Sequence, residues 1–500
     1  MNRHYILFIS CLLFSASTIQ AQIAQLNPKI VTVRQYEKEA NKAFEIRDYN
    51  SALEYYLIIL KDQPTRTDLF WNTAESARQT RHYTVAYKYF ESLNQTDLAK
   101  NYPQLTFKRA MVKKSLGEYE GAVTLFKAFI AGVPIAGTTN ANDLVKEAQA
   151  EIEACEWAKP IAESKPTYDL VHLDNTVNSN YTDIAPVQHG NTLYYTSAYF
   201  ANETNKPVTH IYKLDAKGKP ENLDINSTVE GQYTAHFALN TEGSRVYYNI
   251  GTMRNKTEFH AEIYYRDKDA NSMWKAPMRL PDTINTQMYT ATQPNIGLDK
   301  ATGREILYFV SDRPGGKGGL DIWYSGIDAQ GNFGIPKNLS DVNTAKDDIT
   351  PFYFNKAQIL FFSTEGYKTM GGFDVFYVNK NETGNWSTPT PGGFPLNSSY
   401  DETYYSISGE TGRSYFVSNR KGGNCISPDK DCVCNDIYNF DIKLDLKAET
   451  FLATTGEALK GCEVELYDVD TKTSIKLTLN NEGNNFYSNP KENQNYYPHY

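Results

Sequence analysis

The chain lacks an excess of positive charge and, beyond its first residues, any long apolar run. Its 50 lysines and arginines are outnumbered by 59 aspartates and glutamates, which gives a net charge of −9. No basic cluster stands out, and binding to nucleic acid or to anionic membranes requires one. No later stretch approaches the roughly 20 apolar residues of a spanning helix. We therefore expect no nucleic-acid partner and no transmembrane segment after the N-terminal region.

Sequence signatures of several enzyme classes are also absent. The chain has no Gly-x-Ser-x-Gly elbow, no His-Glu-x-x-His motif and no Gly-x-x-x-x-Gly-Lys-Ser/Thr phosphate loop. Its eight histidines are scattered singly; His236 and His260 flank one hairpin, but isolated histidines in strands are more often packed than ligands. No pair of carboxylates can be singled out as acid and base. We expect no catalytic residue, no metal, no cofactor and a protein that is not an enzyme.

The first 21 residues have the pattern of an export signal. Met1-Asn-Arg-His supplies a basic start, residues 6–16 a short apolar core, and Ala21-Gln22 a cleavage site. Lipid attachment at Cys11 is the alternative, but the apolar run before that cysteine is short. We predict a signal peptide at 1–21 and a mature protein in the periplasm or associated with the outer membrane through partners.

Cysteine is scarce. The six residues are Cys11, Cys155, Cys425, Cys432, Cys434 and Cys462. Three of them crowd the stretch "NCISPDKDCVCNDIY", where no histidine is near to complete a four-ligand zinc site. In an exported protein a disulfide is the expected use of such thiols. We predict a disulfide from Cys425 to either Cys432 or Cys434.

What the chain does contain is, first, a repeated helical pattern between residues 33 and 160. Small residues recur where two helices approach closely, and aromatic residues fill the space beside them. The copies are Ala40, Ala43, Tyr49, Ala52, Tyr56 and Pro64; Ala74, Ala77, Tyr83, Ala86 and Phe90; and Ala110, Tyr119, Ala122 and Phe126. Their spacing of 34 and then 36 residues is typical of tetratricopeptide repeats. We assign 22–162 to an α-solenoid of this type, capped by a helix around 142–157.

The concave wall of such an array is lined by the first helix of each pair. The residues that we place on it are Asn41, Glu45, Trp71, Glu75, Arg78, Phe107 and Lys114. For any one of them a merely solvated position is the alternative. Trp71 and Phe107 are the favoured partner contacts, because large exposed aromatic residues often anchor interfaces.

The second pattern is a phrase that returns five times after residue 165. A Leu or Phe is followed by Asn-Ser or Asn-Thr, then by an aromatic strand and a third strand. The asparagines are Asn178, Asn226, Asn285, Asn343 and Asn397, separated by 48, 59, 58 and 54 residues. This is the size of a four-stranded propeller blade with its loops. We predict a five-bladed β-propeller over 166–443, in which the strand at 168–173 completes blade five and leaves no open sheet edge.

The stretch "SDRPGGKGGLDIW" joins two strands of blade three and has altered copies in blades four and five. A phosphate loop would lead into a helix, whereas here strand follows strand. We interpret Gly315 and Gly316 as turn residues, and Asp321, Asp374 and Asp436 as caps on backbone N–H groups of the turns. Binding of a metal or substrate by these residues is the alternative.

The tail, residues 446–500, has the pattern of alternating strands. It resembles the opening of a carboxypeptidase-regulatory-like β-sandwich, but it is too short for seven strands. The fold class is thus multidomain, α plus all-β.

The repeats resemble WD40-like propeller repeats of the TolB type, with residues 311–323 as the best match. The whole domain order resembles OmpA-family envelope proteins of Bacteroidota, some of which belong to type IX secretion. The peptidoglycan-binding domain usual in that family is not present in these 500 residues.

The resemblance implies a non-catalytic scaffold or adaptor of the cell envelope. Envelope proteins or peptides would bind through the helical groove and one propeller face, where shared tethering strengthens both contacts. The alternative is a propeller that binds or processes glycans at the mouth of its central channel.

Overall fold

The computed structural model describes residues 32–132, 139–200, 207–215, 217–255, 258–380, 384–424 and 434–441, and short strands and turns between 446 and 499. The helical region and most of the propeller form one compact unit, and the strands of the tail belong to a second. The predicted signal peptide and Cys425, Cys432 and Cys462 lie outside the described residues. The signal and the disulfide therefore stay predictions.

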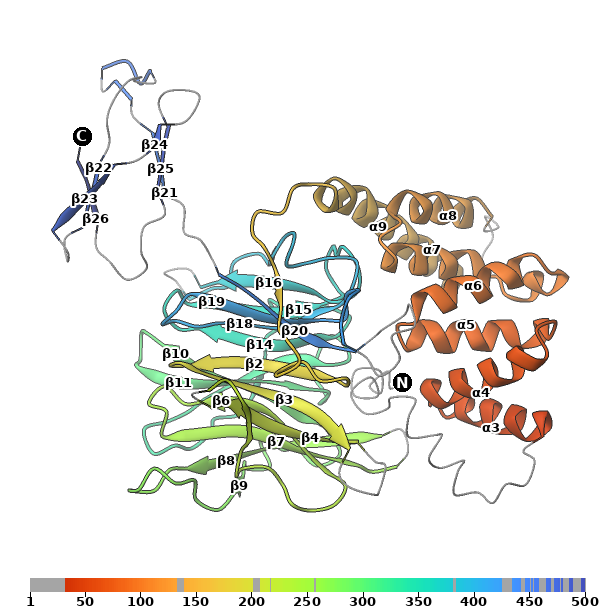
Figure 1. Ribbon diagram of the computed structural model, residues 1–500, viewed down its shortest axis with the longest axis horizontal. Helices are drawn as coiled ribbons and strands as arrows, with labels where there is room; N and C mark the ends of the chain where they lie inside the picture. The colour runs from red at the N-terminus through yellow and green to blue at the C-terminus, as the bar shows by residue number, and fades with distance from the viewer. Residues whose placement is uncertain are drawn as a thin grey trace. The chain divides into compact units, whose positions relative to one another are not determined.

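The N-terminal part is built from helices, as Figure 1 shows. Three pairs and a final helix are described: α3 (Val33–Glu45) with α4 (Tyr49–Asp62), α5 (Phe70–Gln79) with α6 (Tyr83–Asn94), α7 (Leu105–Ser115) with α8 (Tyr119–Gly132), and α9 (Thr139–Ala162). The predicted small positions lie at the helix contacts. Seven of these alanines have no exposed surface: Ala40, Ala52, Ala74, Ala77, Ala86, Ala110 and Ala122. Among the described helices, none combines the length and apolar character needed to cross a bilayer.

Five four-stranded antiparallel sheets form the propeller, so the predicted fold class is confirmed (Figure 1). Blade one is β2 (Asp183–His189), β3 (Thr192–Phe200), β4 (Pro207–Leu214) and β5 (Pro220–Asn222). Blade two is β6 (Gln232–Leu239), β7 (Arg245–Met253), β8 (Phe259–Asp267) and β9 (Met278–Arg279). Blade three is β10 (Ala291–Asp299), β11 (Arg304–Ser311), β12 (Asp321–Gly326) and β13 (Lys337–Asn338). Blade four is β14 (Asp348–Phe354), β15 (Ile359–Thr364), β16 (Asp374–Asn379) and β17 (Thr390–Pro391).

Blade five closes the ring. Its strands β18 (Glu402–Ile407), β19 (Arg413–Ser418) and β20 (Asp436–Asp441) are joined at the outer edge by β1 (Val171–His172). The register pairs Val171 with Asn439 and His172 with Tyr438. The prediction that an N-terminal strand completes this blade is confirmed.

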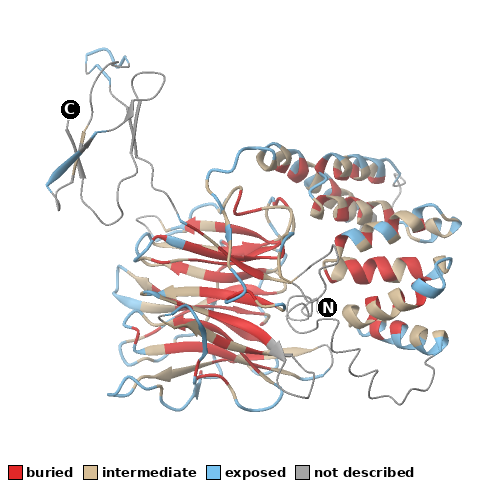
Figure 2. Cartoon of the chain, viewed as in Figure 1, coloured by how far each residue is buried: buried red, intermediate tan, exposed pale blue. Residues whose placement is uncertain are grey.

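The repeated asparagine lies in the segment that follows the last strand of a blade, and its side chain forms hydrogen bonds with the backbone of the third strand of that blade. In blade three, Asn343 accepts a hydrogen bond from the N–H of Ile322 at 3.0 Å and donates one to its carbonyl at 2.8 Å. The other pairs are Asn178 with Ile437, Asn226 with Ile211, Asn285 with Ile263, and Asn397 with Val375. All five asparagines are buried, as Figure 2 shows for most of the strand residues around them. Each side chain thus pairs a buried N–H group and adds a second hydrogen bond to a buried carbonyl, which also accepts from another backbone N–H.

The inner strands β2, β6, β10, β14 and β18 each carry one residue in the left-handed region near their middle. These residues are Ala185, His236, Gln293, Thr350 and Tyr404, with φ between 52° and 62°. In four of the blades the register to the second strand shifts at this point. Such bulges bend the strand and re-aim its side chains, here toward the central channel.

The tail forms two small antiparallel sheets. One contains β21 (Leu446–Glu449), β25 (Asn485–Ser488) and β24 (Thr478–Leu479), and the other β23 (Thr473–Lys476), β22 (Glu465–Asp468) and β26 (Tyr496–His499). The tail is therefore all-β, as predicted.

The asparagine contact predicts a specific loss of stability. Replacing Asn343 by leucine leaves the buried N–H of Ile322 unpaired, at about 1–3 kcal/mol. It also removes one of the two hydrogen bonds to the Ile322 carbonyl, which still accepts from the N–H of Leu339. We expect Asn343→Leu to lower the free energy of unfolding by about 2–4 kcal/mol in denaturant titration. The control is Asn332→Ala, in an exposed loop of the same blade, for which we expect less than about 0.5 kcal/mol. Equal midpoints for the two variants would contradict the role of the amide.

Candidate functional site

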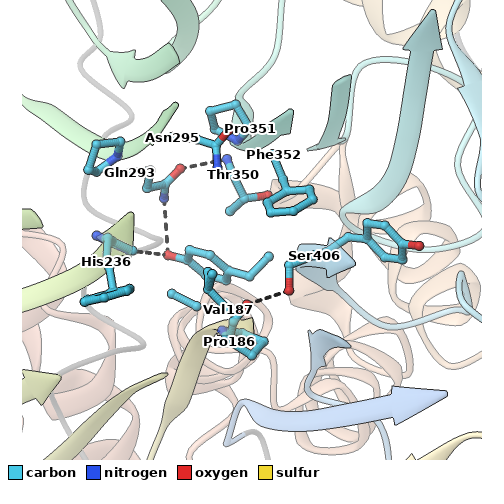
Figure 3. Close-up of a pocket in the computed structure, with 14 residues that line it drawn as sticks. Pro186, Val187, His236, Gln293, Asn295, Thr350, Pro351, Phe352 and Ser406 are labelled. Carbon is cyan, nitrogen blue, oxygen red and sulfur yellow. Dashed lines mark hydrogen bonds between the residues drawn. The ribbon is translucent and has the colours of Figure 1, made fainter. Parts of the chain in front are cut away.

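The central channel of the propeller is closed by a hydrogen-bonded network of the bulge residues. The hydroxyl of Tyr404 lies 2.9 Å from Nε2 of His236 and accepts from Nε2 of Gln293 at 3.2 Å. The Oε1 atom of Gln293 accepts from the N–H of Thr350 at 2.7 Å. Figure 3 shows His236, Gln293 and Thr350 converging in this way. Side chains from blades two, three and five and a backbone group of blade four therefore meet at one point.

The network assigns a neutral imidazole to His236. Its Nδ1 contacts Oδ1 of Asn249, which can only accept, so Nδ1 carries the proton and Nε2 accepts from the Tyr404 hydroxyl. Burial lowers the pKa of His236 to about 4, because a charged ring loses its hydration there. Burial also raises the pKa of the Tyr404 hydroxyl. Both groups are therefore uncharged near neutral pH.

Two pockets lie along the inner strands. The narrow one, of about 40 Å³, is lined by residues of the network, and the wide one measures about 230 Å³. Both are lined by Val187, Phe237, Asn295 and Phe352. The wide pocket is lined by residues at the ends of the inner strands, such as Asn240.

Two asparagines of the wide pocket are held by neighbouring blades. Oδ1 of Asn295 accepts from the N–H of Tyr353 at 2.8 Å, and Oδ1 of Asn355 accepts from the N–H of Leu298 at 2.7 Å. These bonds fix the orientation of both amides. Within the described residues neither Nδ2 group has a hydrogen-bond partner, and both side chains are only partly buried. Each Nδ2 is thus an oriented donor that a ligand can use.

Aromatic rings form the apolar part of the same lining. Phe237 is buried and stacks on Tyr194 with ring centroids 4.0 Å apart, whereas Phe352 and Phe354 are partly exposed. No aspartate or glutamate occurs among the described residues that line either pocket. The ammonium group of Lys356 donates to the carbonyl of Gly409. The pocket therefore offers amide donors, aromatic faces and one exposed ammonium group.

The predicted groove residues have a different environment. Asn41 is exposed and accepts from the Tyr56 hydroxyl at 2.8 Å. Trp71 is half-buried and stacks on Tyr102, with ring centroids 4.4 Å apart. Phe107 is buried among the rings of α8. Of the two favoured aromatic anchors, neither is an exposed side chain.

The charged groove residues pair within the chain. Glu75 binds Arg78 at 2.6 Å and is buried. Lys114 is 2% exposed, and its Nζ lies 2.6 Å from Glu151 and 3.2 Å from the hydroxyl of Thr369 in blade four. Whether these residues bind a partner stays a prediction.

The predicted turn residues shape hairpins in the described part of the chain. Gly315 has φ +93°, and a Cβ on Gly316 would lie 2.2 Å from the Asp321 carboxylate, which accepts from the N–H of Gly318 at 3.0 Å. Asp374 accepts from the N–H of Met370 at 2.8 Å. The third aspartate, Asp436, accepts from the N–H of Asn424 at 2.6 Å and lies 2.7 Å from Nε2 of His172. Among the described residues no group of three ligand side chains is arranged to hold a metal ion.

Sequence reasoning did not find the pocket. Its central residues follow the repeat asparagine by 7, 10, 8, 7 and 7 positions, so no fixed offset marks them. A usable signal was the residue that follows the bulge: proline or an aromatic residue in every blade, namely Pro186, Phe237, Pro294, Pro351 and Tyr405. Aligning the five repeats on that position brings the channel residues into one column.

The buried neutral histidine predicts a pH dependence. Its pKa lies below the ordinary 6.5, at about 4, so the unfolded state binds the proton first as pH falls. The neutral ring therefore contributes about 3 kcal/mol to the free energy of unfolding. This contribution is fully present above the pKa of the unfolded state, and it is lost as the pH falls to the pKa of the folded state. His236→Gln keeps a donor and an acceptor but does not titrate. We expect the stability difference between wild type and this variant to shrink by about 3 kcal/mol between pH 7 and 4 in denaturant titrations.

Asn271→Gln, an exposed exchange that removes no titratable group, provides the control. Its difference from wild type should stay constant over the same pH range. A constant difference for His236→Gln would contradict the assignment of a neutral, buried ring.

No family model and no curated protein matches the chain. Solved structures are similar to it at low identity. An exo-β-1,3-galactanase from Clostridium thermocellum is 12% identical, with a TM-score of 0.35, over 63% of this chain and 76% of the enzyme. An α-L-arabinofuranosidase from Lactobacillus brevis is 12% identical, with a TM-score of 0.36, over 57% of this chain and 94% of the enzyme. A tetratricopeptide domain from Arabidopsis is 15% identical, with a TM-score of 0.20, over 23% of this chain and 93% of that domain.

The comparison corrects one prediction. We predicted from missing motifs that the chain is not an enzyme, and that prediction is wrong as it stands. Two of the similar structures are glycoside-cleaving enzymes. Glycosidases work with paired carboxylates brought together by the fold, so the absence of a local sequence motif does not separate this chain from them.

Proposed function

We propose that the chain binds a glycan at the mouth of its propeller channel. The observation that carries the proposal is the pair of oriented Nδ2 donors, Asn295 and Asn355, beside the partly exposed rings of Phe352 and Phe354. Sugars present hydroxyl groups at the ring edge and C–H groups on the ring face. Amide donors satisfy the first, and aromatic faces pack against the second. Pockets of this kind, apolar with a few placed polar groups, are the usual form of ligand sites.

The size of the pocket limits the part of the ligand that enters. Ligand pockets commonly measure about 300–1,000 Å³, and the wide pocket is about 230 Å³. The network of His236, Gln293 and Tyr404 lines the adjoining narrow pocket of about 40 Å³. The pocket therefore suits one terminal sugar residue, with the remainder of the chain outside the mouth.

The polar and aromatic groups of the lining suit a neutral sugar. The Nδ2 donors of Asn295 and Asn355 match ring hydroxyl groups, and the rings of Phe352 and Phe354 match the C–H face. Lys356 donates to the carbonyl of Gly409 and keeps its positive charge at an exposed position. We propose neutral hexoses or pentoses as the class.

We also propose a location in the cell envelope, where such glycans are accessible to an exported protein. The N-terminal export pattern of residues 1–21 supports this location. Membership in the OmpA family and a part in type IX secretion remain predictions from the resemblance.

The test exchanges single atoms of the two amides. Asn295→Asp and Asn355→Asp keep the Oδ1 acceptor that holds each side chain but replace the Nδ2 donor with an oxygen. A wild-type screen on a glycan array identifies the ligand, and calorimetry then measures affinity. We expect each variant to bind about 5- to 10-fold more weakly, the value of about one hydrogen bond.

Asn271→Asp is the matched control, because it adds the same charge in an exposed loop of blade two. Its affinity should equal that of wild type. Mass spectrometry of the incubated ligand shows whether binding is followed by cleavage. A chain that binds no glycan on the array, or whose affinity is unchanged in both pocket variants, would contradict the proposal.

A further inference from the structure

The turns between the second and third strands of blades three, four and five are related in sequence but differ in one charged position. In blade three, Arg313 follows Ser311 by two residues and donates to its hydroxyl at 2.9 Å and to the carbonyl of Thr283 at 2.8 Å. In blade five, Arg420 likewise donates to Ser418 at 3.1 Å and to a preceding carbonyl. These arginines tie each turn to its own blade.

Blade four has Glu365 at the same position. Its carboxylate lies 3.3 Å from Nη2 of Arg81, which belongs to the helical array. Nε of the same arginine lies 3.0 Å from Asp401 of blade five. The side chains of Arg81 and Asp401 are only 15% and 8% exposed. A charge pair this far from water is costly to break, because removal of one partner leaves the other buried and uncompensated.

A second exchange lies at the tip of the turn. Met370 precedes Asp374 by four residues, as Lys317 precedes Asp321, and both backbone N–H groups donate to the respective aspartate. Lys317 is exposed, whereas Met370 is 1% exposed and belongs to the apolar cluster of α7, α8 and α9. The aspartate thus accepts from the turn backbone in both blades, although the blade-four turn is one residue longer. The side chain at this position differs, and in blade four it packs against helices.

The contacts of this turn fall on the residues predicted to line the groove. Thr369 accepts from Nζ of Lys114, and Met370 shares its cluster with Phe107. Arg81 stands at the turn between α5 and α6. The helical surface of α5 and α7 therefore meets a carboxylate, a hydroxyl and an unbranched apolar side chain on one short, glycine-containing turn. Two outer pairs, Lys346 with Glu147 and Lys368 with Glu153, are largely exposed and contribute little.

We propose that this surface, centred on Arg81, Phe107 and Lys114, is a binding site for a glycine-containing turn with an acidic and a methionine-like side chain, and that the chain's own blade-four turn occupies it. An external segment of the same chemistry competes with the internal one. A carboxylate in that segment takes the place of Glu365 beside Nη2 of Arg81, whose Nε stays paired with Asp401. The internal turn is tethered to the site, so it occupies the site in most molecules. The apparent affinity for an external segment is reduced in proportion to the fraction of molecules in which the site is free. This site is separate from the pocket in the channel.

The experiment uses the complete chain and a fluorescent synthetic peptide with the sequence of residues 363–374. Met370→Lys introduces the residue that blade three carries at this position, so the turn itself is expected to form. Glu365→Arg introduces the residue of blades three and five and repels Arg81. We expect the peptide to bind both variants at least about tenfold more tightly than wild type. Amide exchange in α7 should become faster, while the thermal transition of the propeller persists.

Lys317→Met is the control, because it makes the reverse exchange on the turn that lies in solvent. Its peptide affinity and its exchange rates in α7 should match those of wild type. Equal peptide affinity in wild type and both variants would overturn the proposal. So would unchanged exchange in α7, or a released α7 that fails to bind the peptide. None of these outcomes bears on glycan binding, so the two proposals can fail separately.

Discussion

The propeller depends on one hydrogen-bonding arrangement: an asparagine side chain that pairs with both peptide groups of a buried residue in the third strand. It occurs at all five blade junctions, including the one where β1 meets β20. A primary amide presents a donor and an acceptor side by side, as a peptide group does. It therefore continues the hydrogen-bond ladder at the place where the chain must leave the sheet for the next blade.

This junction also determines where the inner strands begin. The first residue of β14, Asp348, donates its N–H to the carbonyl of Leu320 at 2.7 Å, directly before the third strand of the previous blade. With the start of each inner strand held, its bulge falls at the same depth in the channel. The junction residues repeat because each blade needs the same bonds. The channel residues do not repeat, because the blades contribute different groups to one network: the side chains of His236, Gln293 and Tyr404 and the N–H of Thr350.

The turns in blades three to five show how a repeated element acquires a separate use. The turn backbone is preserved by the aspartate that accepts from its N–H groups, as in Asp321 and Asp374. Two side chains change: Glu365 stands where blades three and five have an arginine, and Met370 where blade three has a lysine. In blade three the arginine is buried and bonds to its own turn, and the lysine is exposed. In blade four Glu365 pairs with Arg81, and Met370 packs against helices.

The sequence by itself determined the helical repeats, the five blades, the ring closure by β1 and the all-β tail. Each of these follows from local periodicity and turn chemistry that recur along the chain, and Asn178 to Asn397 mark the blades without any reference to distant contacts. Only the tertiary structure decided which residues form the pocket, such as Asn295 and Asn355, and that Phe107 and Lys114 are buried rather than exposed in a groove. Burial of those side chains depends on elements that lie far away in sequence, as in the contact of Lys114 with Thr369, and no local pattern encodes what packs against it.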